Sequence, residues 1–169
     1  MALMYLDEFF DYKNELMKTL CSNKDIVRLV TDSKDAPVPN YDLAYSQIFP
    51  FEFVPETVDD GMTFICFDVD IPEVIDKTYY LPALYVWVFT HKSKMRLNEG
   101  GIRTDQLAVE INKELNGSRY FGLGELDLYS VGRFSPITDY QGRVLTYSAR
   151  DFNRVGTSRR PPANRKQRE

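Results

Sequence analysis

The stretch MTFICFDVDI, residues 62–71, determines the fold class, because its apolar side chains recur at every second position. This period is typical of a β-strand that buries one of its faces. A second stretch, ALYVWVFTH at 83–91, is almost entirely apolar and predicts a central strand that is partly covered on both faces. The side chains of the first strand that we expect to face the core are Thr63, Ile65, Phe67, Val69 and Ile71.

Two further strands are expected near the C-terminal end, at about 125–134 and over GRVLTYSARDF at 142–152. A helix is expected between the two strand pairs, from Thr104 to about Asn116, because its apolar residues share one face. Thr104 suits the N-cap position of this helix, and Gly117 suits the position after its last turn.

The N-terminal part predicts two helices. Residues 3–20 carry a helical apolar period, and Ser22 or Asn23 can cap a second, shorter helix. The order of elements is therefore α-α-β-β-α-β-β. This order predicts one α+β domain over residues 1–153, with a four-stranded antiparallel sheet made of two β-hairpins and flanked by helices.

The connection over residues 41–60 is too apolar for an ordinary surface loop. Burying an aromatic ring is worth about 1.5–3 kcal/mol, and long irregular connections are usually functional or part of an interface. Pro50 and Pro55 keep the segment extended. We therefore expect an inter-subunit or inter-ring contact here, made by Phe49, Phe51 and Phe53.

The last sixteen residues, RVGTSRRPPANRKQRE at 154–169, form a basic arm with six basic side chains and one acid, about +5. The chain as a whole has a net charge of −4, so residues 1–153 carry about −9. This composition cannot bury a core, and we expect an arm that is disordered in the free subunit and becomes ordered on an acidic neighbouring surface. A solvated tail and a contact with DNA are the alternatives. The arm residues expected at an interface are Arg159, Arg160, Arg165, Lys166 and Arg168.

Residue types that carry catalysis are sparse. His91 is the only histidine, so no catalytic triad or two-histidine metal motif can form. Asp68 and Asp70 share a strand face and could hold a divalent cation with Glu73, near Lys77, but we prefer the simpler interpretation, a solvated or subunit-facing strand face. We expect no cofactor, no metal and no enzymatic activity.

Other signals are similarly negative. The stretch FGLG at 121–124 lacks the ending of a phosphate-binding loop and precedes a strand rather than a helix. Cys21 and Cys66 match no metal or redox spacing and are expected to be buried, reduced thiols. We expect no signal peptide and no membrane-spanning helix.

Several stretches resemble the tail-terminator, or tail-completion, proteins of long-tailed bacteriophages. They are the element order over residues 3–153, IFPFEFVPET (48–57), the strand pair that ends in His91, IRTDQLAVEINKEL (102–115) and GRVLTYSARDFN (142–153). The basic arm lies outside this resemblance.

The resemblance implies a structural virion protein. Members of that family form a hexameric ring on the last ring of the tail tube, stop its growth and present a surface to the neck of the filled head. We therefore expect a homo-hexamer at the tail–neck junction of the virion, assembled in the host cytoplasm, with no membrane association. Its expected partners are the tail tube protein and the head–tail connector or neck proteins, with passive contact with passing DNA. Arg103, at the start of the helical stretch, is included among the expected interface residues. A neck protein of the same virion and a nucleic-acid-associated module that acts through the arm remain the alternatives.

Overall fold

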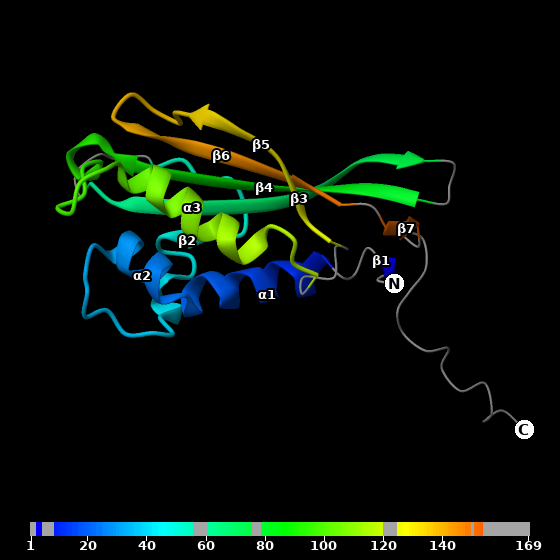
Figure 1. Ribbon diagram of the computed structural model, residues 1–169, viewed down its shortest axis with the longest axis horizontal. Coiled ribbons are helices and arrows are strands. Elements are labelled where there is room, and N and C mark those ends of the chain that lie inside the picture. Colours follow the sequence, from blue (N-terminus) through cyan, green and yellow to red (C-terminus); the bar gives the residue numbers. More distant parts are fainter. Residues whose placement is uncertain are drawn as a thin grey trace, which may run out of the picture.

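The computed structural model describes residues 3–4, 9–55, 61–75, 79–119, 125–149 and 151–153 of the chain. It contains three α-helices and one mixed sheet, which form a two-layer α+β arrangement (Figure 1). None of the helices in this part is long and apolar enough to span a membrane. The helices are α1 (Phe9–Ser22), α2 (Lys24–Thr31) and α3 (Arg103–Leu115), and the strands are β1 (Leu3–Met4), β2 (Ile48–Phe49), β3 (Thr63–Ile75), β4 (Tyr79–His91), β5 (Asp127–Phe134), β6 (Tyr140–Ser148) and β7 (Asp151–Asn153).

Four long strands form the body of the sheet. They make the two expected hairpins, β3 with β4 and β5 with β6, and β4 pairs with β6 to join them, all antiparallel. The register aligns Cys66, Trp87 and Val144 across three neighbouring strands. This confirms the α+β class and the order of the long elements.

The predicted four-stranded antiparallel sheet is nevertheless incomplete. Short strands extend it, with β2 parallel to β3 and β1 parallel to β7, while β7 pairs with β4. In place of the expected strand at 142–152 there are two strands, since β6 ends at Ser148 and β7 begins at Asp151. Strands of two or three residues contain no repeat of a period of two, so the sequence pattern could not reveal them.

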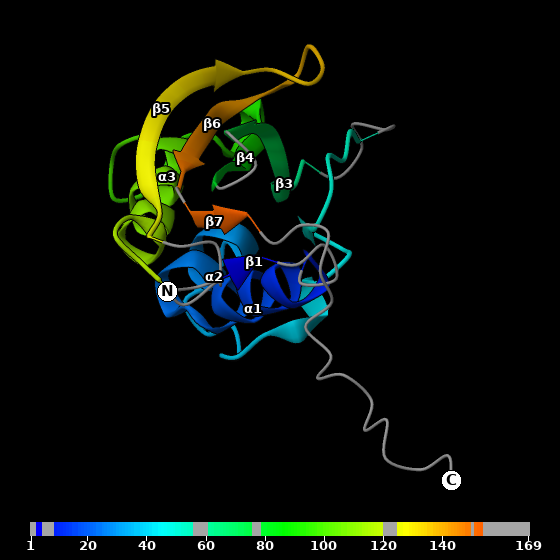
Figure 2. The ribbon, with the colours of Figure 1, turned by 90° about the vertical axis from the view of Figure 1, so that its right-hand side faces the viewer.

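All three helices pack on one face of the sheet, which curves over them (Figure 2). This face holds the set that alternation predicted, with Ile65 and Phe67 fully buried and Val69 7% exposed. At the usual coefficient, burial of each such side chain contributes about 1.5–3 kcal/mol. Their partners in the core come from every helix and from the central strands: Leu16, Leu20, Ile26, Val27, Val30, Leu84, Val86, Val88, Leu107, Ile111, Leu115, Leu145 and Tyr147.

Helix ends follow the expected chemistry in two places and depart from it in two. The Asn23 side chain accepts hydrogen bonds from the backbone N–H groups of Asp25 and Ile26, which confirms it as the N-cap of α2. Gly117 has φ +74° directly after the C-cap of α3, as expected. However, α3 begins at Arg103 without a side-chain cap, so Thr104 is not its N-cap. The first helix begins at residue 9 rather than 3, because Leu3–Met4 pairs with β7.

Candidate interaction surface

The second face of the sheet carries aromatic rings instead of aliphatic side chains. Phe64, Phe89 and Tyr140 are buried there around Cys66, in a cluster separate from the helix-covered core. Ring centroids lie 5.5 Å apart for Phe64 and Phe89, and 6.1 Å apart for Phe89 and Tyr140. The aromatic face extends to Trp87 and Phe134, with centroids 6.4 Å apart. It therefore forms a second small core that no described helix covers.

The segment after β2 covers part of this aromatic face. The rings of Phe49 and Phe53 stack 4.1 Å apart at 12°, and Phe53 lies 5.4 Å from Phe64. The Cys66 thiol also donates a weak hydrogen bond to the Phe53 carbonyl at 3.9 Å. The connection that the sequence singled out is thus anchored on the subunit's own sheet over residues 49–53.

The three predicted interface phenylalanines differ in their burial. Phe49 is only 6% exposed and belongs to the subunit core, and Phe53 is half-buried against it. Phe51 lies between them, is 44% exposed and touches Phe49 at a centroid distance of 5.5 Å. In the isolated subunit, Phe51 is the ring of this set that is most available to a partner.

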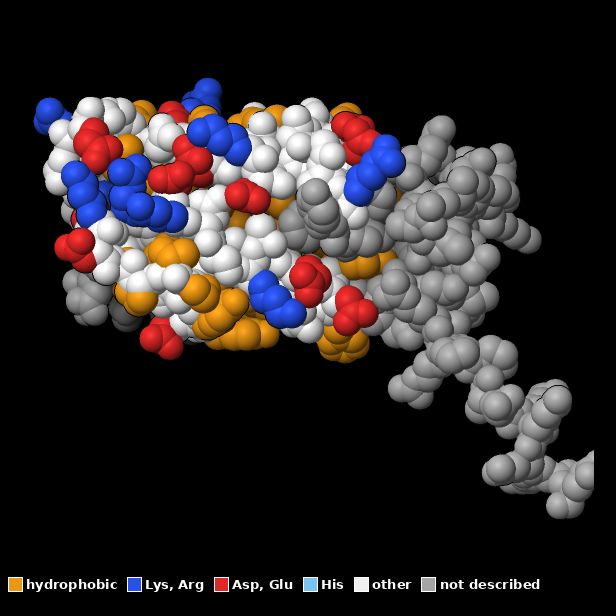
Figure 3. All heavy atoms as spheres, turned by 60° about the horizontal axis from the view of Figure 1, so that its bottom comes forward, with side chains coloured by type: hydrophobic (Ala, Val, Ile, Leu, Met, Phe, Trp, Pro, Cys, Tyr) orange, Lys and Arg blue, Asp and Glu red, His pale blue; other side chains and the backbone are white. Residues whose placement is uncertain are grey.

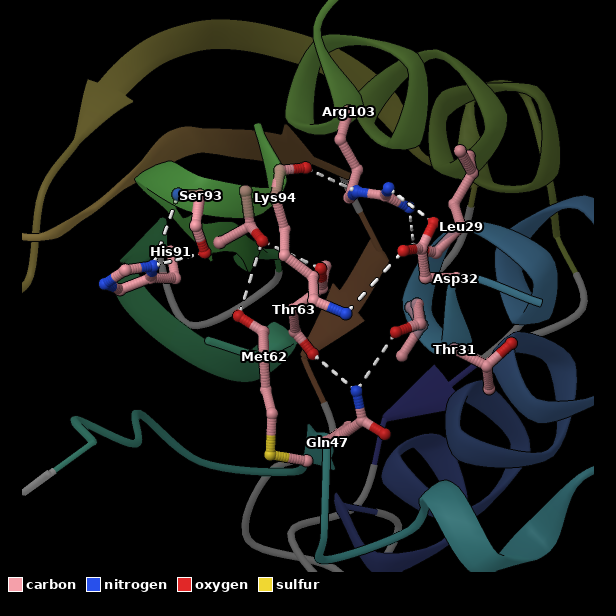
Figure 4. Close-up of polar contacts among 12 residues, drawn as sticks. Leu29, Thr31, Asp32, Gln47, Met62, Thr63, His91, Ser93, Lys94 and Arg103 are labelled. Atoms are coloured by element: carbon pink, nitrogen blue, oxygen red, sulfur yellow. Dashed lines mark hydrogen bonds and ion pairs between the residues drawn. The ribbon is translucent and has the colours of Figure 1, made fainter. Parts of the chain in front are cut away.

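Arg103 lies inside the subunit rather than on its surface (Figure 4). Its side chain is 4% exposed, and its Nε and Nη1 donate to the carbonyls of Lys94 at 2.7 Å and Leu29 at 2.8 Å. Its Nη2 pairs with Asp32, the left-handed C-cap residue of α2, at 2.6 Å. These contacts tie the start of α3 to the end of α2. A guanidinium held in this way offers little surface to a partner, so its role in an interface stays a prediction without support from its geometry.

Gln47 makes a second polar junction beside the contacts of Arg103 (Figure 4). Its Nε2 donates to the carbonyls of Val30 and Thr63, both at 3.1 Å, and so joins α2 to the start of β3. The hydroxyls of Thr63 and Thr90 bond across the strand pair at 2.8 Å. No sequence signal marked Gln47, because its two partners are backbone carbonyls 16 and 17 residues away.

Two of the residues weighed for catalysis, His91 and Asp68, have structural partners, and Asp70 is exposed. His91 Nδ1 accepts from the Ser93 backbone N–H at 3.2 Å, which caps a short turn at Lys92–Lys94. Asp68 pairs with Lys13 at 2.8 Å and accepts from the Val69 N–H at 2.8 Å. In the described part of the chain, no three His, Cys, Asp or Glu residues lie together as metal ligands would. The Glu73 side chain, Lys77 and the FGLG stretch at 121–124 lie outside the described residues.

The two cysteines are buried free thiols, as expected. Burial raises the pKa of the Cys66 thiol to about 12 and raises that of Cys21 as well. Burial likewise raises the pKa of the Tyr147 hydroxyl, which donates to Asn112 Oδ1 at 2.9 Å. These groups stay protonated at neutral pH, so neither thiol is an activated nucleophile.

The predicted arm residues Arg159, Arg160, Arg165, Lys166 and Arg168 lie outside the described residues. Several exposed hydrophobic side chains in the described part lie within residues 38–54, while Phe10 and Tyr129 are exposed elsewhere. Hydrophobic side chains gather along the lower part of the helix-bearing side in Figure 3. The exposed members of this segment are Val38, Tyr41, Tyr45, Phe51 and Val54.

One comparison with known proteins gives a match. The model of the YomW family matches residues 23–149, which includes every long strand, α2 and α3. This family is named after a protein of a Bacillus phage region, which indicates a phage-associated protein. No curated protein and no solved structure matches the chain significantly.

Proposed function

Because the chain belongs to the YomW family, whose model matches 127 of its 169 residues (23–149), we propose that it is a structural protein of a phage virion. In this proposal it caps the tail tube as a ring, ends tail polymerisation and forms the surface on which the head joins the tail. The resemblance of its sequence to tail terminators supports the finer part of the proposal. A ring of six subunits is the expected assembly.

The observation that carries this proposal is the anchored segment 45–54. Stacking of Phe49 on Phe53 holds the segment against the sheet, while the rings of Tyr45 and Phe51 stay 66% and 44% exposed. Exposed aromatic rings on an immobilised segment favour binding, since little conformational entropy is lost when a partner covers them. Such a surface suits a protein that assembles rather than one that turns over a substrate.

The test of the proposed function is deletion of the gene in the phage. We expect tails of uncontrolled length and heads without tails, seen by electron microscopy of lysates. Tails of normal length on attached heads would refute the proposal. Tails of normal length that fail to join heads would instead identify a neck or connector protein.

The charge of the arm supports a second candidate function, that of a module that binds nucleic acid. Six cationic side chains within sixteen residues could neutralise several phosphates, and the affinity would then fall steeply with salt. Titration of double-stranded DNA with the full chain at two salt concentrations tests this. Salt-dependent binding that disappears when Arg159 and Arg160 are changed to Glu would favour this function over a purely structural one.

A further inference from the structure

A groove lies between α1 and the edge of the sheet at β3. Its volume is about 490 Å³, and apolar side chains from three separate segments make up most of its lining. β2 pairs with β3 only as far as Cys66, so within the described residues no strand flanks this edge at Val69. The lining residues are Phe10, Lys13, Asn14, Met17, Tyr45, Pro50 and Val69.

Two aromatic rings of the groove are left in water. Phe10 is 76% exposed and Tyr45 is 66% exposed, although aromatic side chains normally bury most of their surface. Tyr45 also has φ +61°, a left-handed conformation that costs a non-glycine residue free energy. Its N–H is held by the Ile48 carbonyl at 2.8 Å, which keeps the backbone in this conformation. A strained, exposed tyrosine in an apolar groove indicates a binding site.

The surroundings of the groove are acidic. The described segments that form it, 10–22, 41–55 and 61–71, carry six acidic and two basic side chains, a net charge of −4. Of the two lysines, Lys13 pairs with Asp68 at 2.8 Å and Lys18 with Glu15 at 3.1 Å. Asp42, Glu52 and Asp70 are exposed. A ligand with positive charge next to an apolar centre would fit this groove.

The chain itself contains such a ligand. The arm includes the run Arg159-Arg160-Pro161-Pro162-Ala163, in which two arginines precede two prolines. Consecutive prolines favour the polyproline II conformation, and grooves lined by aromatic rings bind this conformation with a small loss of entropy. We propose that the groove between α1 and β3 binds this Arg-Arg-Pro-Pro segment of a second copy of the chain.

The topology favours a contact between copies, and this step rests on the proposed ring. β7, which precedes the arm, pairs with β4 on the side opposite to β3 (Figure 2). β7, the last described element before the arm, therefore lies on one side of β4, whereas the groove lies on the other, at the edge of β3. A donor and a receptor on opposite sides give a head-to-tail contact, which closes into a ring when the rotation between copies allows it. Sixteen residues at about 3.1 Å each span on the order of 50 Å, enough to reach a neighbour.

A peptide titration tests the groove. A fluorescent peptide of residues 154–169 is added to the full chain that carries Arg159→Glu and Arg160→Glu, so that its own arm does not compete. We expect saturable binding that Tyr45→Asn or Asn14→Lys weakens by about tenfold or more, since loss of one central contact or a positive charge in the lining has that effect. Asparagine tolerates the left-handed backbone at position 45, which protects the fold. A peptide with Pro161→Ala and Pro162→Ala should also bind more weakly.

Matched controls come from β5. Tyr129 is 77% exposed and Asp127 is exposed, and both lie outside the groove. Tyr129→Asn and Asp127→Lys should leave the peptide affinity unchanged. Phe10→Ser is a second groove variant for the case in which Tyr45→Asn alters the melting curve. Absence of saturable binding, or equal weakening by the control substitutions, would overturn the proposal.

A mixing experiment shows whether the contact is made between copies. One chain carries Tyr45→Asn with Asn14→Lys, the other carries Arg159→Glu with Arg160→Glu, and each alone lacks one half of the contact. We expect a heterodimer by sedimentation only in the mixture, because one intact arm then meets one intact groove. No association in the mixture would mean that the arm folds back on its own subunit and would overturn the proposed exchange. Tail-length control in the phage is read separately, so a failed terminator role and a failed groove give different results.

Discussion

One face of the sheet is covered by three helices, whereas the other is covered, over part of its length, by the extended segment 49–53. The helix-covered face is aliphatic and deeply buried, with Ile65, Val86 and Val88 at 0% exposure. The aromatic face is a smaller cluster that is also buried at its centre, with Cys66 and Phe89 at 0% exposure, whereas Phe51, which touches Phe49 at its margin, is 44% exposed. Both faces are therefore buried within the chain, but the margin of the second leaves an aromatic ring exposed.

The largest expected effect concerns Gly142 of β6, which pairs with Phe89 of the neighbouring strand β4. A Cβ at this position would lie 1.7 Å from the Val88 carbonyl oxygen and 2.7 Å from Phe89 Cα. Because both atoms belong to backbone, Gly142→Ala should destabilise the fold by more than about 4 kcal/mol or prevent folding, measured by urea denaturation. Gly132→Ala is the control, since its Cβ would meet only a Val144 methyl, at 3.3 Å. Similar stability of the two variants would contradict this account.

The next effect separates the two faces. Phe67 is fully buried against the helices, so Phe67→Ala should cost about 3–5 kcal/mol of unfolding free energy. Phe53 belongs to the extended segment and is half-buried against Phe64, so Phe53→Ala should cost less than half as much. Denaturant melts of the purified subunit provide both values. Equal losses would mean that the aromatic face contributes to the subunit fold as strongly as the helix-covered one.

Unfolding at alkaline pH tests the burial of one titratable side chain on each face of the sheet. Cys66 on the aromatic face and Tyr147 on the helix-covered face have raised pKa values, so each loses protons more readily in the unfolded chain. Each group contributes fully to the free energy of unfolding at pH values below its pKa in the unfolded chain. This contribution falls as pH rises above about 9 for Cys66 and about 10 for Tyr147, by up to about 1.4 kcal/mol per pH unit for each group. Cys66→Ala and Tyr147→Phe should each flatten the loss between pH 9 and about 12. An unchanged pH profile would show that these groups are hydrated.

The smallest effect on the subunit is expected from Phe51. Its ring is 44% exposed, so Phe51→Ala should change the unfolding free energy by less than about 1 kcal/mol. Assembly should weaken much more, because the ring is expected to be covered only in the complex. Sedimentation of the variant over a range of concentrations measures this. A variant that melts and assembles like the wild type would remove segment 49–53 from the interface.

Local pattern was sufficient for the long elements. The period of two over 62–71 and the period near 3.6 over 104–115 predicted β3 and α3, because each repeats several times within one element. The same reasoning placed α2 with Ser22 or Asn23 as its cap, and the structure shows that the cap is Asn23. It missed the two-residue strands and Gln47, whose partners lie far away in the sequence.

The sequence also predicted only part of the candidate interaction surface. The sequence identified Phe49, Phe51 and Phe53 as too apolar for a plain loop, but their shared composition could not rank them. Tertiary packing decided that Phe49 belongs to the core while Phe51 stays exposed, and it placed Arg103 in a clamp between α2 and α3.

What the sequence by itself determined is the α+β class, the order of the long elements and the separation of an acidic domain from a basic arm. These follow from periodicity and charge, which are properties of neighbouring residues. Only the tertiary structure decided that Phe10, Tyr45 and Val69 meet in one groove. Those residues come from three segments with no common pattern, and burial depends on which segments meet in space rather than on residue type alone.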